Sequence, residues 1–265
     1  MAVTSARSRV NLKNAGHFDR GNARLEKYTL ADELPAQLSQ LDLHPRGMSQ
    51  KLHPGYTLRR LTTDDRDAVL KFLNRFFFRD EPMNQAIDLL GASGQCQELE
   101  EYAASSLHDG VSFAAVDDNG DYVGISLNGV VTREEAAELT DKSEQYQDPK
   151  FRRIMRVLWH LESQGRVWEK LPESCHTVME VRIISTHAAW RGRGLMRALC
   201  EETERIALDI GATALRMDTT SAFSAAGAER LGYKKVYAAK YMDLPYAPQP
   251  PAPHLEARVY LKQLL

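Results

Sequence analysis

The sequence has only three cysteines, almost no net charge and no long apolar run. Cys96, Cys175 and Cys200 lie far apart and are odd in number, so they predict neither a zinc site nor a disulfide framework. A reducing compartment such as the cytoplasm fits them best. No segment approaches the roughly 20 apolar residues of a membrane-spanning helix, and the N-terminus lacks the apolar core of a secretory signal.

The charge balance also limits the classes of partner. A net charge of −2 gives no indication of binding to nucleic acid or to an anionic membrane surface. We therefore expect a monomeric cytoplasmic protein that binds no metal ion, no nucleic acid and no membrane, and whose partner is a small molecule.

Residues 1–50 differ in composition from the rest of the chain, because they are polar and carry many basic side chains. Early arginines with few acids would suit a mitochondrial presequence, but the apolar residues show no amphipathic repeat. We therefore predict a solvated, partly disordered extension, with a short helix over residues 31–43. Residues 51–265 are long enough to form a folded domain with a substantial core.

Within residues 51–265, strand-like and helix-like patterns alternate. This alternation predicts one α/β domain with a mixed central sheet flanked by helices. Asn119-Gly120 favours a tight hairpin turn with positive φ angles, and residues 245–254 read as a linker or lid. Strands are expected over residues 56–61, 111–116, 122–130, 178–184, 214–217, 233–241 and 257–261, and helices from Thr62 or Thr63 to Pro82 and over residues 98–107, 149–165, 195–210 and 222–230.

The segment 178–210 joins a buried strand to an amphipathic helix through Arg191-Gly192-Arg193-Gly194. A helix N-terminus has unpaired N–H groups, and glycines let a ligand approach the backbone, so such a turn suits a phosphate. No Gly-Lys-Ser/Thr follows, which excludes a P-loop, and the three-glycine spacing of dinucleotide sites is incomplete. The turn alone is equally compatible with an ordinary connection that carries two solvated arginines.

Several motifs along residues 55–265 together indicate a family. The segment 190–196 resembles the coenzyme A signature of the GNAT superfamily of acetyltransferases, with Arg191 and Gly194 matching and Met196 where glycine or alanine is usual. The segments 56–65 and 76–84 are similar to the opening of the insect-type arylalkylamine N-acetyltransferases, and residues 231–233 resemble the superfamily's Leu-Gly-Phe.

This resemblance implies a GNAT-like domain that uses acetyl-CoA as co-substrate. Backbone groups of a strand edge would pair with the pantetheine amides, and the glycine turn would hold the pyrophosphate. The residues expected to bind acetyl-CoA are Ile184, Ser185, Thr186, Arg191, Gly192, Arg193, Gly194, Leu195 and Met196.

The resemblance also implies which residues are catalytic. Glu81 stands where these enzymes have their general base; we expect it at the C-terminal end of a helix, where the helix dipole would raise its pKa. Without the resemblance, an exposed surface acid is the better interpretation. Thr220 and Ser224 match hydroxyl residues of the arylalkylamine branch, which replace a tyrosine found elsewhere in the superfamily, at Ala228 here. Helix capping explains Ser224 equally well and explains Thr220 better.

The resemblance predicts an N-acetyltransferase that acts by direct attack of a small arylalkylamine, of the dopamine, serotonin or tyramine type, in a ternary complex. Phe76, Phe77, Phe78, Tyr122 and Trp159 could line an aryl pocket, although their spacing more simply indicates core residues. One alternative is a polyamine or lysine acetyltransferase of the same fold. The acidic run over residues 134–144 is a candidate groove for it, but an exposed helix face explains this run at least as well. Another alternative is a non-catalytic acyl-CoA-binding module.

Overall fold

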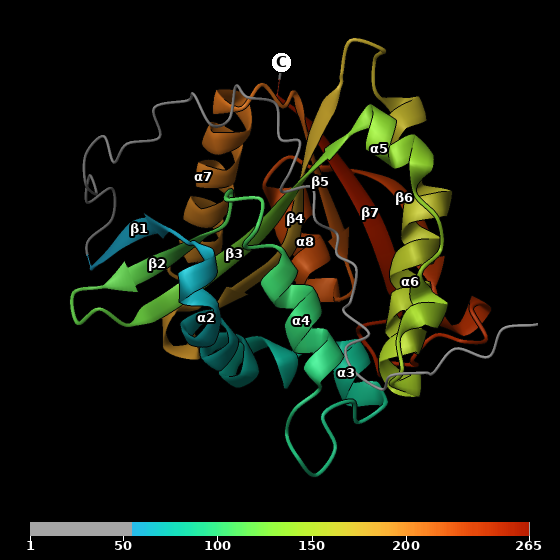
Figure 1. Cartoon of the computed structure of the whole chain (residues 1–265), viewed down its shortest axis with the longest axis horizontal. Helices are drawn as coiled ribbons and strands as arrows, with labels where there is room; N and C mark the ends of the chain where they lie inside the picture. Colours follow the sequence, from blue (N-terminus) through green and yellow to red (C-terminus); the bar gives the residue numbers. More distant parts are fainter. Residues whose placement is uncertain (1–54, 265) are drawn as a thin grey trace, which may run out of the picture.

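The computed structural model describes residues 55–264, and Figure 1 shows their arrangement. The extension predicted over residues 1–50, its helix at residues 31–43 and the start of the domain at residue 51 lie outside the described residues. Within residues 55–264, no helix combines the length and the apolar character that crossing a membrane requires.

The centre of the fold is a seven-stranded mixed sheet with the order β1-β2-β3-β4-β5-β7-β6. Among its neighbouring strands, only β4 and β5 run parallel, and a helix connects them as a parallel crossover requires. The strands are β1 (Tyr56–Arg60), β2 (Phe113–Asp117), β3 (Tyr122–Thr132), β4 (Thr177–Thr186), β5 (Ala214–Thr219), β6 (Lys234–Lys240) and β7 (Glu256–Gln263).

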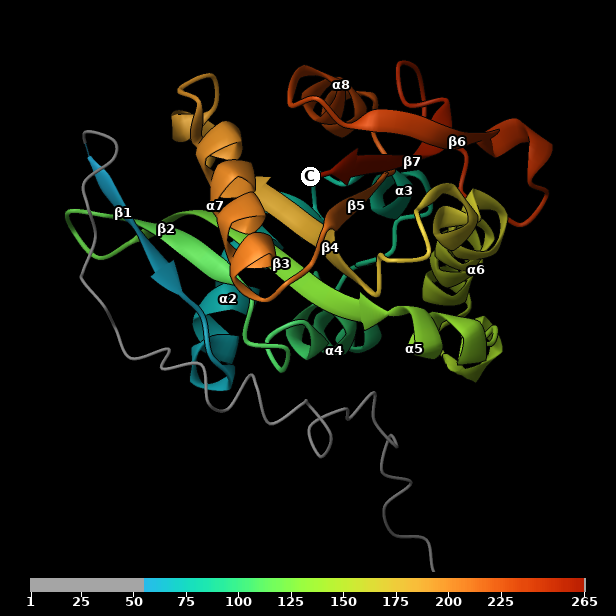
Figure 2. The same cartoon turned by 90° about the horizontal axis from the view of Figure 1, so that it is seen from above.

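Helices cover both faces of this sheet, and each face has its own buried cluster (Figure 2). One cluster includes Leu199 and Cys200 and lies beneath α7 (Leu195–Asp209) and α8 (Ala222–Arg230). The other includes Phe78 and Phe151. It is shared by α2 (Arg66–Leu73), the π-helical turn η2 (Asn74–Phe78), α3 (Pro82–Ala86), α4 (Gln97–Ser105) and α6 (Pro149–Gly165).

The two parallel strands separate at a bulge in β4. Leu127 pairs with Ile183 and Asn128 with Val181, so Arg182 is an extra residue that bends the strand. Pairing between β4 and β5 ends at the same place, with Val181 opposite Met217. Beyond it β4 continues to Thr186 beside β3 alone and β5 continues beside β7, which leaves an opening between their C-terminal ends.

Three details of the fold differ from the sequence predictions. The first helix ends in η2 at Phe78, and Pro82 begins α3 instead of ending that helix. In the β2–β3 hairpin only Gly120 has a positive φ, because the Asp117 carboxylate holds the turn by accepting from the N–H groups of Asn119 and Asp121. The helix that the acidic run over residues 134–144 could form is short, since α5 (Arg133–Glu138) covers only the start of that run, and the remaining elements follow the expected order.

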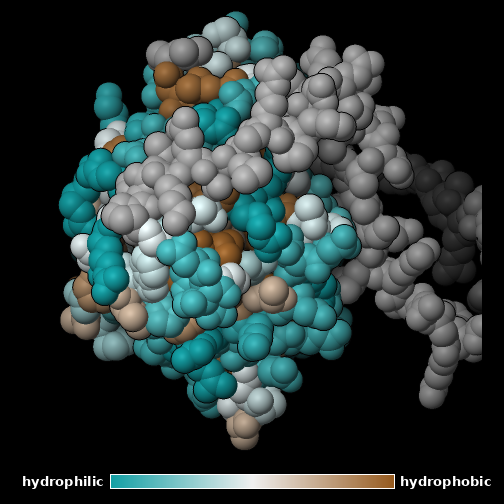
Figure 3. All heavy atoms as spheres, turned by 90° about the vertical axis from the view of Figure 1, so that its left-hand side faces the viewer, coloured by the Kyte–Doolittle hydropathy of each residue, from teal (hydrophilic) through white to brown (hydrophobic). Residues whose placement is uncertain are grey.

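The surface on one side of the molecule is mostly hydrophilic. Figure 3 looks at the left-hand side of Figure 1, and the residues coloured there are mostly hydrophilic, with hydrophobic ones in small separate groups. The visible part of this side therefore has no continuous apolar surface of the kind that marks a large protein interface.

Candidate active site

The segment 76–84 crosses the opening between β4 and β5 and is attached to both strands. On the β4 side, the Ser185 hydroxyl donates to the carbonyl oxygen of Phe76 over 3.1 Å. On the β5 side, the Thr220 hydroxyl donates to the Glu81 carboxylate over 2.8 Å. Glu81 is thus fixed beside the opening by contacts that reach 139 residues along the chain.

Glu81 is a buried carboxylate, with 8% of its surface exposed. Its second oxygen accepts from the backbone N–H of Asn84 over 2.7 Å. Burial raises the pKa of Glu81, because the charged form loses its water, while the hydrogen bonds from Asn84 and Thr220 oppose this by favouring the carboxylate. A raised pKa brings a carboxylate closer to the working range of a general base at neutral pH.

The structure corrects the predicted environment of Glu81. It is the N-cap of α3 and lies at the N-terminal end of a helix, not at the C-terminal end. A helix N-terminus favours the negative form, so the dipole argument gave the wrong cause. The predicted upward direction of the pKa is confirmed, and its cause is burial.

Ser224 lies in the capping turn of α8, as the capping argument expected, but Thr220 has a different role. Ser221 is the N-cap of α8, and its hydroxyl accepts from the Ser224 N–H over 3.0 Å. Thr220 is therefore not the cap, and its hydroxyl instead holds Glu81. The Ser224 hydroxyl lies 2.9 Å from that of Ser221, in the capping turn, and does not contact Glu81.

Tyr241 also stabilises this arrangement, although no motif in the sequence indicated it. Its side chain is fully buried, and its hydroxyl donates to the carbonyl oxygen of Thr220 over 2.8 Å. The Gln249 side chain donates to the Tyr241 carbonyl oxygen over 2.8 Å. Because these contacts fix the segment after β6, it is packed against the site over part of the expected linker, and Ala247 is also buried.

The glycine turn before α7 has the geometry that a phosphate site needs. Gly192 and Gly194 have φ angles of 75° and 81°, which L side chains rarely adopt, and nothing lies within 4 Å of where a Cβ would project from either. Gly194 is the N-cap of α7, and no side chain caps its first N–H groups. These residues fit a pyrophosphate, since free N–H groups and open space meet at a helix N-terminus.

The two arginines of the turn are held in different ways. Arg191 forms an ion pair with Asp80 over 2.9 Å, and both side chains are about half exposed. The Arg193 guanidinium lies over the ring of Trp190, 5.4 Å from its centroid. Arg191 therefore connects the glycine turn with the residue that precedes Glu81.

Met196 turns away from the phosphate-binding turn. A Cβ added to Gly227 of α8 would lie 2.7 Å from the Met196 Cε atom, so the methionine packs where α8 has no side chain. A methionine at this position therefore leaves the backbone of the turn accessible. Ile184, Ser185 and Thr186 lie on the part of β4 that has left β5, as an edge for pairing with an extended ligand requires.

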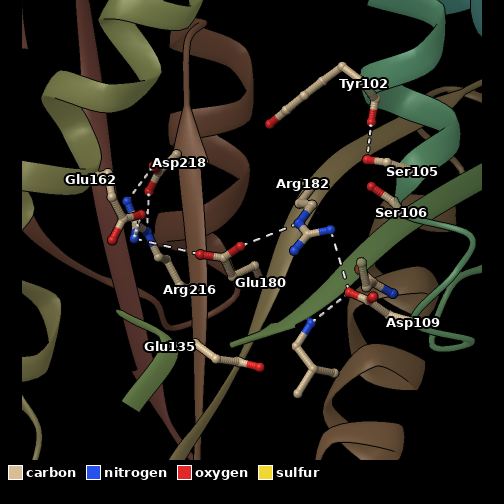
Figure 4. Close-up of polar contacts among 12 residues, drawn as sticks. Tyr102, Ser105, Ser106, Asp109, Glu135, Glu162, Glu180, Arg182, Arg216 and Asp218 are labelled. Carbon is tan, nitrogen blue, oxygen red and sulfur yellow. Dashed lines mark hydrogen bonds and ion pairs between the residues drawn. The ribbon is translucent and has the colours of Figure 1, made fainter. Parts of the chain in front are cut away.

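A chain of charged residues crosses the sheet on the face that carries Glu81 (Figure 4). Buried Arg216 of β5 pairs with Asp218 over 2.7 Å and also contacts Glu162 of α6 and Glu180 of β4. Arg182 then joins Glu180 to Asp109, over 3.4 and 3.5 Å. Four carboxylates thus share two guanidinium groups, and burial raises the pKa of Glu162 and of Asp218. The carboxylates in this chain thus outnumber the guanidinium groups.

Metal chemistry finds no support within residues 55–264, where no cluster of His, Cys, Asp or Glu side chains is arranged to hold an ion. Cys96, Cys175 and Cys200 are buried and free. Burial raises the pKa of Cys200 to about 12, so this thiol stays protonated and inert at neutral pH.

The chain was compared with known proteins. No protein-family model matches it. Among solved structures, arylalkylamine N-acetyltransferase 2 from Aedes aegypti is 28% identical with a TM-score of 0.70, covering 79% of this chain and 99% of its own. A Drosophila melanogaster polyamine N-acetyltransferase that forms N-acetylagmatine is 21% identical with a TM-score of 0.69, covering 78% of this chain and 99% of its own.

The mixed sheet, the opening between two parallel strands and the glycine turn at a helix N-terminus thus occur in a chain whose structure matches these acetyltransferases. The chain is an N-acetyltransferase with the GNAT fold, and it resembles the insect arylalkylamine N-acetyltransferases.

Proposed function

We propose that the protein transfers an acetyl group from acetyl-CoA to the primary amine of a small arylalkylamine, by direct attack in a ternary complex. The observation that carries the proposal is the buried Glu81 carboxylate, fixed by Thr220 beside the opening between β4 and β5. At neutral pH the amine arrives protonated, and a base must remove a proton before the nitrogen can attack.

Each part of the site has one task in this proposal. Acetyl-CoA supplies the activated acetyl group as a thioester. The free N–H groups before α7 bind its pyrophosphate, with Arg191 and Arg193 beside them, and the free edge of β4 over residues 184–186 aligns its pantetheine arm. Glu81 accepts the proton of the ammonium at a carboxylate oxygen, and Thr220 keeps that carboxylate in place. Ser224 is the candidate that returns a proton to the leaving sulfur.

The aromatic residues near Glu81 favour an aryl acceptor. Phe78 is fully buried in the core. Three consecutive residues on a helix point about 100° apart, so at most two of the three phenylalanine rings can face the core. Phe76 is only partly buried and lies against His187, with ring centroids 4.3 Å apart, next to the end of β4. An apolar wall with a carboxylate nearby suits an arylalkylamine, and the Aedes aegypti neighbour is named for this substrate class.

A polyamine acceptor is the second candidate, and the charged chain in Figure 4 favours it. Its four carboxylates exceed its two guanidinium groups, which suits a substrate with two ammonium groups. The acidic run after β3 is a weaker candidate than predicted, because the Glu135 carboxylate accepts from the Thr132 N–H and caps α5.

A panel of amines tests the proposal. Tryptamine and phenethylamine should give a kcat/KM at least about tenfold above that of spermidine or a lysine peptide, the discrimination that burying one ring supplies. If spermidine equals or exceeds every aromatic amine, the acceptor is a polyamine. If calorimetry shows that acetyl-CoA binds while no amine releases free thiol, the protein is an acyl-CoA-binding module.

A further inference from the structure

A second hollow lies away from the acetyltransferase site, between α6, residue 141 and the segment that follows β6. Its volume is about 310 Å³, close to the lower end of the range of about 300–1,000 Å³ that small-molecule sites occupy. The lining residues are three with aromatic rings and three polar ones: Trp159, His160, Tyr246, Asp141, Arg156 and Ser163.

Trp159 faces this hollow because of its position on α6. The side of the helix that packs into the core carries Ile154, Val157 and Leu161, which are all buried. At about 100° per residue, Trp159 points well away from these residues. It is absent from the buried clusters and from the residues packed on them, so the core role favoured by its spacing is wrong for this residue. A large ring that the core does not use is left to line a cavity.

The walls of the hollow are held by hydrogen bonds that need no ligand. His160 is fixed by the Tyr237 hydroxyl, which lies 2.8 Å from its Nε2 atom. The Arg153 guanidinium donates to the carbonyl oxygens of Tyr246 and Ala247, each over 2.9 Å, and so fixes the backbone that carries the Tyr246 ring. A site with rings fixed in advance loses little conformational entropy when it binds.

One carboxylate that lines the hollow is available to a cation. The Arg156 guanidinium pairs with Glu144, with its Nε atom 2.7 Å from the carboxylate, and Arg152 contacts the same carboxylate over 3.9 Å. Asp141 accepts from the Ser143 N–H over 2.8 Å, and within residues 55–264 it forms no ion pair. Burial lowers the pKa of His160, so its ring is neutral at pH 7 and does not repel a positive group. Asp141 is therefore the one carboxylate among the lining residues, and it lies beside three rings without an ion-pair partner in residues 55–264.

We propose that this hollow is a second binding site, separate from Glu81, that takes a small aromatic amine. The ring of the ligand lies among Trp159, His160 and Tyr246, and its ammonium group is directed to Asp141. Aromatic faces attract both rings and cations, and a carboxylate distinguishes an amine from a neutral or acidic compound of equal size. The site does not depend on the acetyltransferase reaction.

Fluorine NMR of the full chain labelled with 5-fluorotryptophan tests this site. The chain has three tryptophans, Trp159, Trp168 and Trp190, and Trp159→Phe identifies the resonance in question. Tyramine should move the Trp159 resonance saturably. In Asp141→Asn the affinity should fall by up to about fivefold, the scale of an exposed ion pair. Ser163→Ala, which removes neither a ring nor a charge from the same wall, should bind tyramine as the wild type does.

Two further arms separate this site from the catalytic one. In Glu81→Gln the tyramine response of Trp159 should be unchanged, whatever happens to turnover. With 3-(4-hydroxyphenyl)propionate, which has the same ring and the opposite charge, the response should be weaker by at least the same factor. A Trp159 resonance that tyramine does not move overturns the site, and equal responses to the amine and the acid overturn the ligand class.

Discussion

Glu81 experiences two opposing effects, and their balance can be measured. Burial raises its pKa, and the hydrogen bond from Thr220 lowers it by stabilising the carboxylate. If Glu81 is the base, kcat/KM falls as the pH drops through this pKa, because the protonated form cannot accept a proton. The acidic limb of the pH profile therefore reports the environment of one residue.

Thr220→Val should move that limb to higher pH. Valine keeps the volume of threonine but donates no hydrogen bond, so the pKa of Glu81 rises further and more of it is protonated at pH 7. The measurement is kcat/KM against pH. Thr219→Val is the matched control, since Thr219 donates weakly to the Arg258 carbonyl oxygen and does not contact Glu81. If the acidic limbs of the two pH profiles coincide for the wild type and Thr220→Val, the proposed role of this hydrogen bond is refuted.

Asp80→Asn should tighten the binding of acetyl-CoA. The Asp80 carboxylate occupies the Arg191 guanidinium, which a phosphate must then share. An exposed ion pair is worth about 0.2–1 kcal/mol, so its removal should lower the dissociation constant by at most about fivefold. Calorimetry measures this, with Asp88→Asn as a control that removes an equal charge without contacting Arg191. Weaker binding in Asp80→Asn would show that Asp80 helps Arg191 instead of competing.

At the scale of elements, the bulge at Arg182 and the turn η2 together form the site. The bulge separates β4 from β5, and η2 brings the segment 76–84 across the resulting opening. The charged chain in Figure 4 then ties α6 to both parallel strands through Arg216, which is 5% exposed in its side chain. The position of these elements should therefore depend on that arginine.

Arg216→Met should lower the free energy of unfolding by roughly 3–5 kcal/mol at pH 7, because it leaves Glu162 and Asp218 buried without a cation. The loss should shrink as the pH falls. Burial raises the pKa of both carboxylates in the folded state, so protonation at low pH favours the folded variant. Denaturant unfolding at several pH values checks this.

Arg205→Met is the matched control for that experiment. Arg205 also pairs with two acids, Glu202 and Asp209, but its side chain is 59% exposed. Its loss should cost less than about 1 kcal/mol. If the two variants lose equal free energy of unfolding, burial does not make the ion pairs of Arg216 more stabilising than those of Arg205.

At the scale of the whole molecule, sequence predicted what is local and missed what is distant. Residue patterns within short segments predict the glycine turn, the helix after it and the succession of strands along the chain. The environment of Glu81 could not be predicted in this way. Pro82 can follow one helix or occupy the first turn of the next, and both patterns look alike in sequence. The contacts of Thr220 with Glu81 and of Arg191 with Asp80 span 139 and 111 residues, so no local pattern reports them.

The same separation explains why Tyr241 was missed. Nothing near it in sequence marks it as a partner of Thr220, and only the folded chain brings the residue after β6 to the residue after β5. The molecule thus assembles its candidate site from the segment 76–84, the ends of β4 and β5, and residue 241. The central claim is that this assembly makes Glu81 the base for an amine.

Turnover of Glu81→Gln with acetyl-CoA and phenethylamine tests that claim most directly. Glutamine keeps the shape of the side chain but cannot accept the ammonium proton, so turnover at pH 7 should fall about a hundredfold or more, with acetyl-CoA affinity little changed. The gap should narrow between about pH 6 and about pH 9, because more of the amine is then neutral without help from the enzyme. Wild-type turnover in Glu81→Gln across that range would contradict the account.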